Sequence, residues 1–330
     1  MHITVIGGSG FIGTRLCQML AANPNCDFLI YDKVLSPVFP EKCVIGDVRD
    51  LPSLRERIPS GTRIVNLAAE HRDDVKPRSL YDEVNVGGAR NIVRVASEKS
   101  IDHIVFASSV AVYGSAPART GETGELRPFN EYGRTKALAE DVFRSWRDEN
   151  SNDRSLIIVR PTVVFGEKNR GNVYNLLRQI HSGIFLMVGS GLNRKSMAYV
   201  GNVAAFFEHS VIAMSGNRTF NYVDGPDFCM NELVRIASET MGRNHRANAR
   251  IPYRLALLFG HLADAFATVL NKRFPISAVR VEKFCMESTF TSGASEAGFL
   301  APTPLFEALS STIAYEFLET HDRSTVFYSE

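Results

Sequence analysis

Tyr132 and Lys136 are four residues apart in the run Tyr132-Gly133-Arg134-Thr135-Lys136. On a helix this spacing places both side chains on one face, one turn apart. A nearby ammonium group lets a phenol lose its proton below its ordinary pKa of about 10. The pair therefore predicts a proton acceptor that works near neutral pH, as the oxidation of an alcohol requires. An ordinary exposed helix produces the same spacing, so the prediction depends on other parts of the chain.

The N-terminus carries a glycine-rich loop between a predicted strand and a predicted helix. Residues 2–6 are an apolar, β-branched run, and a helical pattern follows over 11–22. Gly7 allows a tight turn, Gly10 allows close approach to a pyrophosphate, and Gly13 lets the helix pack against the strand. The start of a helix offers free N–H groups and a positive dipole end to phosphates. This context predicts a dinucleotide-binding loop.

A second predicted strand, over 27–31, ends at the carboxylate of Asp32. An acid at this point accepts hydrogen bonds from the adenosine ribose and repels a 2′-phosphate. Asp32 therefore favours NAD over NADP. The neighbouring Lys33 weakens this preference, because a cation tolerates the phosphate.

A third apolar run, over 103–108, leads into the pair Ser108-Ser109. Open α/β sheets bind ligands at the carboxyl ends of their strands. Ser109 is therefore a candidate for hydrogen bonding to the reacting oxygen of a substrate. A serine pair that merely begins a loop is the alternative.

At these positions the chain resembles the extended short-chain dehydrogenase/reductase family, and within it the NAD-dependent sugar-nucleotide epimerases and dehydratases, including the UDP-sugar 4-epimerases. The resemblance covers most of the chain in family order. It rests on Gly7-x-x-Gly10-x-x-Gly13, Gly46-Asp47-Val48-Arg49-Asp50, Asn66-Leu67-Ala68-Ala69, Val84-Asn85-Val86-Gly87-Gly88, Ser109 with Tyr132 and Lys136, and Arg160-Pro161-Thr162-Val163-Val164-Phe165-Gly166.

The resemblance implies roles for the matching residues. Ser109, Tyr132 and Lys136 are the expected catalytic residues. The expected contacts of NAD are Gly7, Gly10, Phe11, Ile12, Gly13, Asp32, Lys33, Asp47, Val48, Leu67, Ala68, Ala69, Tyr132, Lys136 and Pro161. The expected substrate contacts are Ser109, Asn172, Arg194, Lys195 and Arg280. Lys195 stands where the family usually has an arginine on the nucleotide diphosphate, and Arg194 beside it offers a second cation.

The expected chemistry is transfer of a hydride from C4 of a sugar to NAD while Tyr132 takes the hydroxyl proton. Rotation of the 4-keto sugar before hydride return gives a 4-epimerase, and cofactor exchange gives a 4-ketoreductase instead. The dehydratase branch of the family carries an Asp-Glu pair where this chain has Val110 and Ala111, so dehydration is disfavoured. Epimerase is the first interpretation, reductase is the second, and a non-catalytic dinucleotide sensor is the third.

Composition agrees with an ordinary globular enzyme. A net charge of +1 gives no electrostatic reason to expect nucleic acid as a partner. Five scattered cysteines without a Cys-x-x-Cys pair, and histidines without ligand spacing, predict no metal site and a reducing, cytoplasmic location. The resemblance adds a nucleotide-sugar substrate, with UDP as the favoured carrier. It also implies a homodimer formed through helices near 80–99 and 131–150, and a place in polysaccharide assembly.

The pattern predicts an α/β fold with a doubly wound parallel (Rossmann) sheet and a smaller C-terminal α/β substrate-binding domain. The expected domains are 1–165 and 166–330, interleaved with each other. The expected strands are 2–6, 27–31, 42–45, 63–67, 103–108, 155–160, 184–188 and 219–222. The expected helices are 11–22, 80–99, 131–150, 171–182, 230–242, 252–271 and 304–318.

The most apolar late segment, 255–270, is short for a membrane span and carries His261 and Asp264. We therefore expect no integral membrane segment and a helix that packs within the protein. The alternative is a helix that lies on a membrane or against a partner, with Lys272 and Arg273 as surface anchors.

Overall fold

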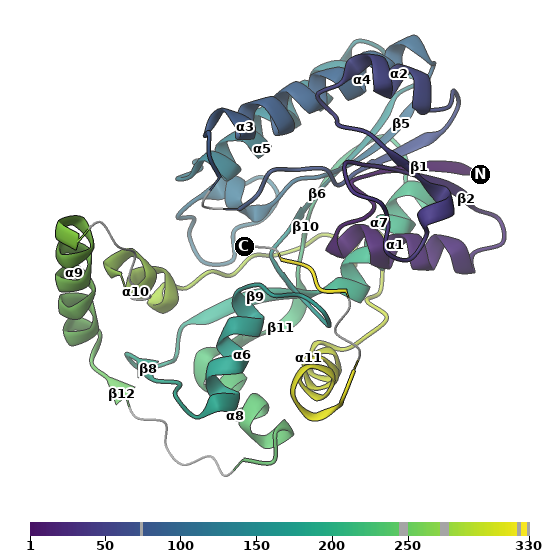
Figure 1. The fold of residues 1–330 in the computed structure, drawn as a ribbon. Coiled ribbons are helices and arrows are strands. Elements are labelled where there is room, and N and C mark those ends of the chain that lie inside the picture. Colours follow the sequence, from purple (N-terminus) through teal and green to yellow (C-terminus); the bar gives the residue numbers. More distant parts are fainter. Residues whose placement is uncertain (73–74, 244–249, 271–276, 322–324, 329–330) are drawn as a thin grey trace.

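The structure is a computed structural model that describes residues 1–72, 75–243, 250–270, 277–321 and 325–328. A seven-stranded sheet in the order β10-β6-β5-β4-β1-β2-β3 forms its larger part (Figure 1). Every neighbouring pair in this sheet is parallel. Its strands are β1 (His2–Ile6), β2 (Asp27–Asp32), β3 (Cys43–Ile45), β4 (Arg63–Asn66), β5 (His103–Ala107), β6 (Ser155–Pro161) and β10 (Asn217–Tyr222). The predicted doubly wound parallel fold is confirmed.

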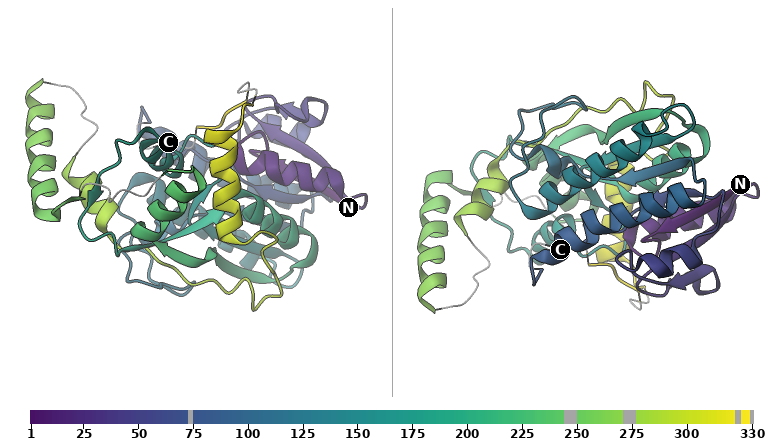
Figure 2. Two further views of the ribbon diagram at one scale, coloured as in Figure 1. Left: turned by 90° about the horizontal axis from the view of Figure 1, so that it is seen from below. Right: turned by 90° about the horizontal axis from the view of Figure 1, so that it is seen from above.

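Alternating side chains of these strands form two cores, one on each face of the sheet. One core joins Ile3 and Val5 to helices α1 (Phe11–Ala22) and α7 (Val200–Ala213). The other joins Ile6 and its neighbours to helices α2 (Leu51–Arg57), α4 (Gly88–Glu98) and α5 (Glu131–Asp148). Figure 2 shows the helices on both sides of the sheet.

The strand order reverses direction between β1 and β4, since β2 and β3 lie on one side and β5 and β6 on the other. Such a reversal opens a crevice at the carboxyl ends of the strands, where doubly wound folds bind their ligands. The loops that follow β1, β4 and β5 therefore meet at one edge of the sheet.

The remaining part of the chain packs below that edge in Figure 1. It contains a three-stranded sheet in the order β11-β9-β7 and a core shared by three helices. Its elements are β7 (Val163–Phe165), α6 (Asn172–Ser182), β8 (Met187–Val188), β9 (Arg194–Tyr199), β11 (Asp224–Cys229), α8 (Met230–Thr240), β12 (Arg250–Ile251), α9 (Tyr253–Leu270), α10 (Ala278–Cys285) and α11 (Leu305–Ile313).

Several elements differ from the sequence prediction. The strand expected near 219–222 is β10, which extends the large sheet beside β6. Helix α7 was not predicted from the sequence, because it is buried on most sides and lacks an amphipathic pattern. The helix expected over 80–99 is divided into α3 (Ser79–Tyr81), a π-helical turn at Asp82–Gly87, and α4. Strands β7, β9, β11 and β12 and helices α2 and α10 were also absent from the prediction.

The glycine-rich loop makes the tightest contact between β1 and α1. An added Cβ at Gly13 would stand 2.6 Å from both the Gly7 carbonyl oxygen and the Gly8 Cα. An added Cβ at Gly10 would meet only the Gly7 oxygen, at 3.5 Å, and Gly10 has a φ of −78° that any residue adopts. The two glycines therefore have separable functions. Gly13 allows α1 to pack against the loop, and Gly10 leaves space in front of the start of α1.

We predict different effects for alanine at these two positions: a loss of stability at Gly13 and a loss of bound NAD at Gly10. Gly13→Ala forces backbone atoms apart and should lower the free energy of unfolding by about 1–3 kcal/mol. Gly10→Ala should leave the melting temperature near that of the wild type but reduce the NAD retained on purification, because its methyl group occupies the approach to α1. Thermal denaturation and the nucleotide content of each purified variant measure both effects. Equal destabilisation by the two substitutions would contradict this assignment.

Candidate active site

Helix α5 carries the predicted proton acceptor. Its first turn is capped by Asn130, whose side-chain oxygen accepts a hydrogen bond from the Gly133 N–H at 2.8 Å. Tyr132 lies in this first turn, and Lys136 follows one turn later on the same face. A Cβ on Gly133 would collide with the Ala111 carbonyl, so glycine lets the start of α5 approach the turn after β5.

Ser109 lies two residues beyond the end of β5 and immediately before the turn Val110–Tyr113. Its hydroxyl oxygen accepts a hydrogen bond from the Ala111 N–H at 3.2 Å. Ser109 also lowers the pKa of the Tyr132 phenol, which places the two side chains within interaction distance. The structure therefore brings the two predicted hydroxyl groups close together at the carboxyl edge of the sheet.

Lys136 is buried beneath this pair. Its ammonium group donates a hydrogen bond to the Ala107 carbonyl oxygen at 2.7 Å. It lies 4.8 Å from the centre of the Phe106 ring and 6.0 Å from the centre of the Tyr132 ring. All three residues expected to be catalytic thus converge at the end of β5.

The electrostatics of this cluster correct one expectation. Burial raises the pKa of Tyr132 to about 12, and the side chain of Ser109 opposes that shift. Burial also lowers the pKa of Lys136 to about 7, against the effect of the nearby Glu140 carboxylate. Lys136 by itself therefore does not bring the phenol pKa toward neutrality, because removal from water penalises the charged form of both groups.

The glycine-rich loop lies beside the segment that follows β4. Gly7 has a φ of +81°, and a Cβ there would stand 2.6 Å from the Ala68 nitrogen. Gly10 provides no side-chain cap for α1, so the first N–H groups, at Phe11 and Ile12, are accessible to a pyrophosphate. This uncapped helix start with open space above Gly10 fits the diphosphate of NAD.

Asp32 ends β2 on the other side of the loop. Its carboxylate accepts hydrogen bonds from the Ser9 N–H at 2.9 Å and the Val34 N–H at 3.1 Å. Lys33 beside it is exposed. The carboxylate is thus fixed next to the glycine-rich loop, where an adenosine ribose would be bound.

The other expected cofactor positions lie at ends of neighbouring strands. Asp47 follows β3, and its hydrogen bonds with Arg49 lower its pKa. Val48 is buried next to Gly88 of α4. Pro161 ends β6, and Leu67, Ala68 and Ala69 follow β4.

The segment after β4 is tied to α5 by Asn85, whose importance was not recognised from the sequence. The Asn85 amide oxygen accepts a hydrogen bond from the Glu70 N–H, at 2.8 Å. Its amide nitrogen donates to the Glu70 carbonyl and to the Thr135 hydroxyl. Asn85 lies in the π-helical turn, so this irregular turn holds the segment after β4 against α5.

The expected substrate residues do not form one cluster. Lys195 donates hydrogen bonds to the carbonyl oxygens of Lys283, at 2.8 Å, and Met286, at 2.5 Å. Arg194 donates to the Asp227 carbonyl at 2.6 Å, on the other side of β9. The structure therefore does not bring Arg194 beside Lys195 as a second cation. Asn172 begins α6, and Arg280 is exposed on α10.

A buried ion pair below the candidate catalytic residues was not recognised from the sequence. The Glu140 carboxylate accepts hydrogen bonds from Arg160 Nε at 2.8 Å and Nη2 at 2.5 Å, and both side chains are buried. Ser108 donates to the same carboxylate at 2.5 Å. The available signals were a carboxylate four residues beyond Lys136 on one helix face and a charged residue within an apolar strand.

Comparison with known proteins agrees with this geometry. The sequence model of the NAD dependent epimerase/dehydratase family matches residues 3–221. The N-acetyl-alpha-D-glucosaminyl-diphospho-ditrans,octacis-undecaprenol 4-epimerase of Escherichia coli O157:H7 is 43% identical and aligns with 100% of this chain and 99% of its own length. UDP-glucose 4-epimerase of Vibrio cholerae is 28% identical over 250 residues, 71% of this chain and 74% of that protein.

Solved structures agree with the fold. UDP-glucose 4-epimerase of Thermotoga maritima with UDP-glucose has a TM-score of 0.74 at 19% identity, covering 96% of this chain and 98% of that chain. The Thermus thermophilus UDP-glucose 4-epimerase in complex with NAD has a TM-score of 0.71 at 20% identity, with the same coverage.

These findings favour the epimerase interpretation over the 4-ketoreductase and over the non-catalytic sensor. NAD is the cofactor of this kind of enzyme, as the sequence predicted. The chain belongs to the NAD-dependent epimerase/dehydratase family.

Proposed function

We propose that the protein is a 4-epimerase of an N-acetylhexosamine that is carried on a diphosphate, with a polyprenyl lipid as the carrier. The observation that carries this proposal is the 43% identity with an undecaprenol-linked 4-epimerase along the whole chain. The proximity of Ser109 and Tyr132 above Lys136 supports the chemistry. The product would enter surface polysaccharide assembly, and the protein would act in the cytoplasm, in agreement with its five free thiols.

In this proposal Tyr132 takes the proton of the sugar C4 hydroxyl and later returns one to the 4-keto oxygen. Ser109 donates a hydrogen bond to the same oxygen and holds it next to the phenol. Lys136 donates a hydrogen bond to the Ala107 carbonyl and so holds α5 against the end of β5, next to the phenol. Bound NAD supplies a reversible hydride acceptor and, when oxidised, a positive charge that favours the tyrosinate. The glycine-rich loop and Asp32 would hold the two halves of NAD.

A UDP-linked sugar is the second candidate substrate. The Vibrio cholerae relative is a UDP-glucose 4-epimerase, although it is less similar and aligns with a smaller part of the chain. Both carriers present a diphosphate on the anomeric carbon, so the same C4 chemistry applies to each.

The first test is proton NMR of the purified protein with N-acetylglucosamine linked by a diphosphate to a short prenyl alcohol, and separately with UDP-N-acetylglucosamine. No NAD is added. The C4 epimer should form from the prenyl substrate without added NAD. Bound NAD that returns its hydride to the sugar is regenerated in each turnover, so it need not exchange with free NAD. If UDP-N-acetylglucosamine is turned over and the prenyl substrate is not, the carrier of the sugar is the nucleotide and not the lipid. Turnover of neither would reject the proposed function.

Tyr132→Phe should lower the turnover number about 10²–10⁴-fold, because the proton acceptor is removed while the ring remains. The variant should keep the NAD content of the wild type, measured after release by denaturation. Ser109→Ala should have a smaller effect, since it removes one hydrogen bond and leaves the phenol. A Tyr132→Phe enzyme with near-normal turnover would remove Tyr132 from the mechanism.

The lowered pKa of Lys136 predicts a pH dependence of stability. Between about pH 7 and its ordinary value of 10.5, the unfolded chain keeps a proton on Lys136 that the folded chain releases. More protons on the unfolded state mean that stability rises with pH, by at most about 1.4 kcal/mol per unit for one group.

Urea denaturation of nucleotide-stripped protein from pH 7 to 8.5 measures this slope and stays below the titration of buried Cys17 and Tyr132, whose pKa values are both raised to about 12. Lys136→Met should remove the part of the slope that Lys136 contributes. Equal slopes for the two proteins would show that Lys136 titrates normally.

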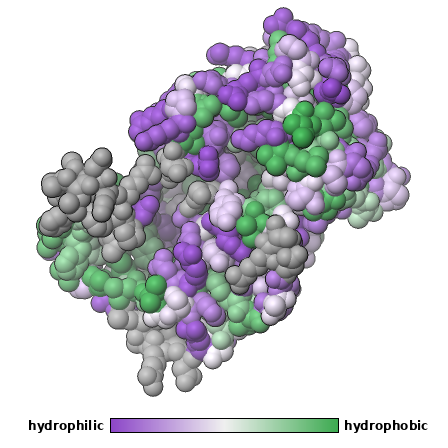
Figure 3. Space-filling model, in the orientation of Figure 1, coloured by the Kyte–Doolittle hydropathy of each residue, from purple (hydrophilic) through white to green (hydrophobic). Residues whose placement is uncertain are grey.

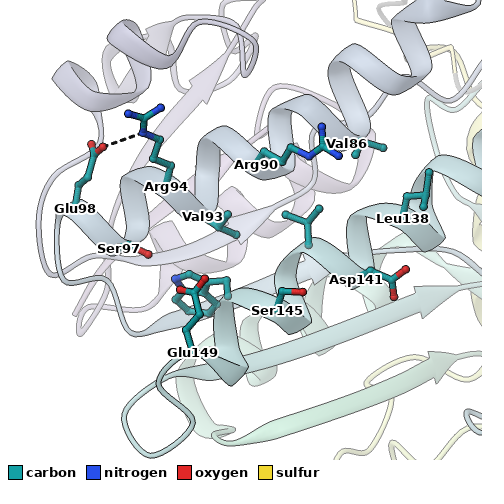
Figure 4. A pocket seen from close by; sticks show the side chains of 12 residues that line it. Val86, Arg90, Val93, Arg94, Ser97, Glu98, Leu138, Asp141, Ser145 and Glu149 are labelled. Atoms are coloured by element: carbon teal, nitrogen blue, oxygen red, sulfur yellow. Dashed lines mark hydrogen bonds and ion pairs between the residues drawn. The ribbon is translucent and has the colours of Figure 1, made fainter.

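We propose a homodimer through the exposed groove between α4 and α5. Figure 4 shows side chains of both helices around this groove, among them Val93 and Leu138, with the Arg94–Glu98 pair at one end. Leu138 is 40% exposed. Leu138→Arg places an unpaired charge in that contact and should convert the dimer to a monomer in light scattering. Leu300→Arg, at an exposed site on a loop, is the matched control. A monomeric wild type would contradict this proposal.

A further inference from the structure

Helix α9 packs against α10 through its small residues. A Cβ on Gly260 would stand 2.7 Å from the Ala278 Cα, so the two backbones approach closely. The Asp264 carboxylate accepts a hydrogen bond from the Ala278 N–H at 3.0 Å, and Ala256 is buried. Positions 256, 260 and 264 are four residues apart and form one face of the helix. The inward face of α9 is therefore built from small and polar groups.

The outward face of α9 is apolar. Leu255, Leu258, Phe259 and Leu262 have the i, i+3, i+4, i+7 spacing of a single stripe, and they are 43%, 53%, 49% and 47% exposed. A surface helix of a globular protein normally turns such a stripe toward its core. Figure 2 shows α9 projecting from the body, and Figure 3 shows hydrophobic side chains along the edge where Figure 1 places it. We call these four residues the α9 stripe.

Positive charge is concentrated in the same part of the chain. Residues 253–286 carry a net charge of +3, whereas the whole chain carries +1. Lys272 and Arg273, the surface anchors considered from the sequence, lie outside the described residues. The charged residues of this segment are Arg254, Lys272, Arg273, Arg280 and Lys283, with Asp264 and Glu282. An apolar stripe with excess positive charge is the composition of a helix that lies in the surface of an anionic membrane.

Helix α10, against which α9 packs, adjoins the expected diphosphate position. Lys195 donates hydrogen bonds to the carbonyl oxygens of Lys283 and Met286, at and just beyond the end of α10. A groove beside them is lined by Val188, Tyr253, Cys285 and Met286, among others. Helix α10 thus connects α9 with Lys195, because it contacts both.

None of the helices in the described part of the chain is long and apolar enough to cross a membrane.

We propose that the α9 stripe docks the protein on an anionic bilayer, with α9 lying in the membrane surface. This inference rests on the proposed function, because a polyprenyl carrier keeps its hydrocarbon chain in the bilayer and presents only its sugar diphosphate to the enzyme. The apolar stripe enters the headgroup boundary, and the exposed Arg254 at the start of α9 contacts anionic headgroups. Helices α9 and α10 then hold Lys195 near the membrane surface, where the sugar diphosphate is available.

Flotation of the NAD-bound protein with vesicles tests the docking. The vesicles contain phosphatidylcholine with phosphatidylglycerol, or phosphatidylcholine alone. Wild-type protein should float with the anionic vesicles. The double variant Leu258→Glu/Leu262→Glu should lose at least about tenfold in partitioning, because two apolar anchors become charges. Leu300→Glu changes a leucine outside the stripe that is even more exposed, at 83%, and this variant should float like the wild type.

Activity separates docking from folding and from the proposed function. The double variant should epimerise the short prenyl substrate in solution like the wild type, but should lose activity on undecaprenyl-linked N-acetylglucosamine in vesicles. A wild type that turns over the short substrate yet does not float overturns the docking and leaves the function intact. A wild type that turns over neither prenyl substrate rejects the proposed function itself.

Two further outcomes would also overturn the docking. The double variant would float like the wild type if another surface held the membrane. Light scattering would show a smaller oligomer for the double variant if a second copy of the chain covered the α9 stripe.

Discussion

The buried ion pair between Glu140 of α5 and Arg160 of β6 is the constraint on which the geometry of the candidate active site depends. Both charges are removed from water, so either one without the other would cost about 3–5 kcal/mol. Helix α5 therefore docks on the sheet only in the position that pairs them. Tyr132, Lys136 and Glu140 share one helix face at intervals of four residues. Fixing Glu140 thus fixes the height of the phenol and the ammonium over the end of β5.

The same pair connects the sheet with more distant parts of the chain. Arg160 donates a hydrogen bond to the Tyr113 hydroxyl, which donates in turn to Asn221 of β10. The Asn221 amide reaches the carbonyl oxygens of Thr120 and Thr291. Buried networks of this kind are stable only when every member is paired. The loop that follows β5 and the segment before α11 are consequently held against β10 at the edge of the large sheet.

The sequence was sufficient where a structure follows from local patterns. The apolar runs at 2–6, 27–31 and 155–160 are strands within one residue of their expected bounds, because buried parallel strands require continuous hydrophobic residues. The glycine spacing before α1 likewise has a local cause, since Gly13 touches the backbone of its own loop. Local patterns therefore predicted both the large sheet and the residues at its carboxyl edge.

Long-range pairings were beyond the reach of the sequence. Nothing local indicates that Glu140 meets Arg160, that Asn85 ties Glu70 to Thr135, or that β10 lies beside β6. Helix α7 was missed because burial on most sides removes the polar stripe that marks a surface helix. The pKa of Tyr132 was misjudged for a related reason. Spacing placed Lys136 near the phenol but gave no measure of how completely the fold excludes water from both.

That exclusion of water has a chemical consequence. Burial raises the pKa of Tyr132 to about 12 and lowers that of Lys136 to about 7, so around neutral pH the phenol is protonated and the lysine is only about half protonated. In such a pocket the phenol responds strongly to any added positive charge, because charges interact over longer distances at low dielectric. A cation next to the phenol favours the tyrosinate, and its neutralisation favours the protonated phenol. A residue that must accept a proton in one half of a reversible reaction and return it in the other is well served by this dependence, and a solvent-exposed tyrosine would lack it.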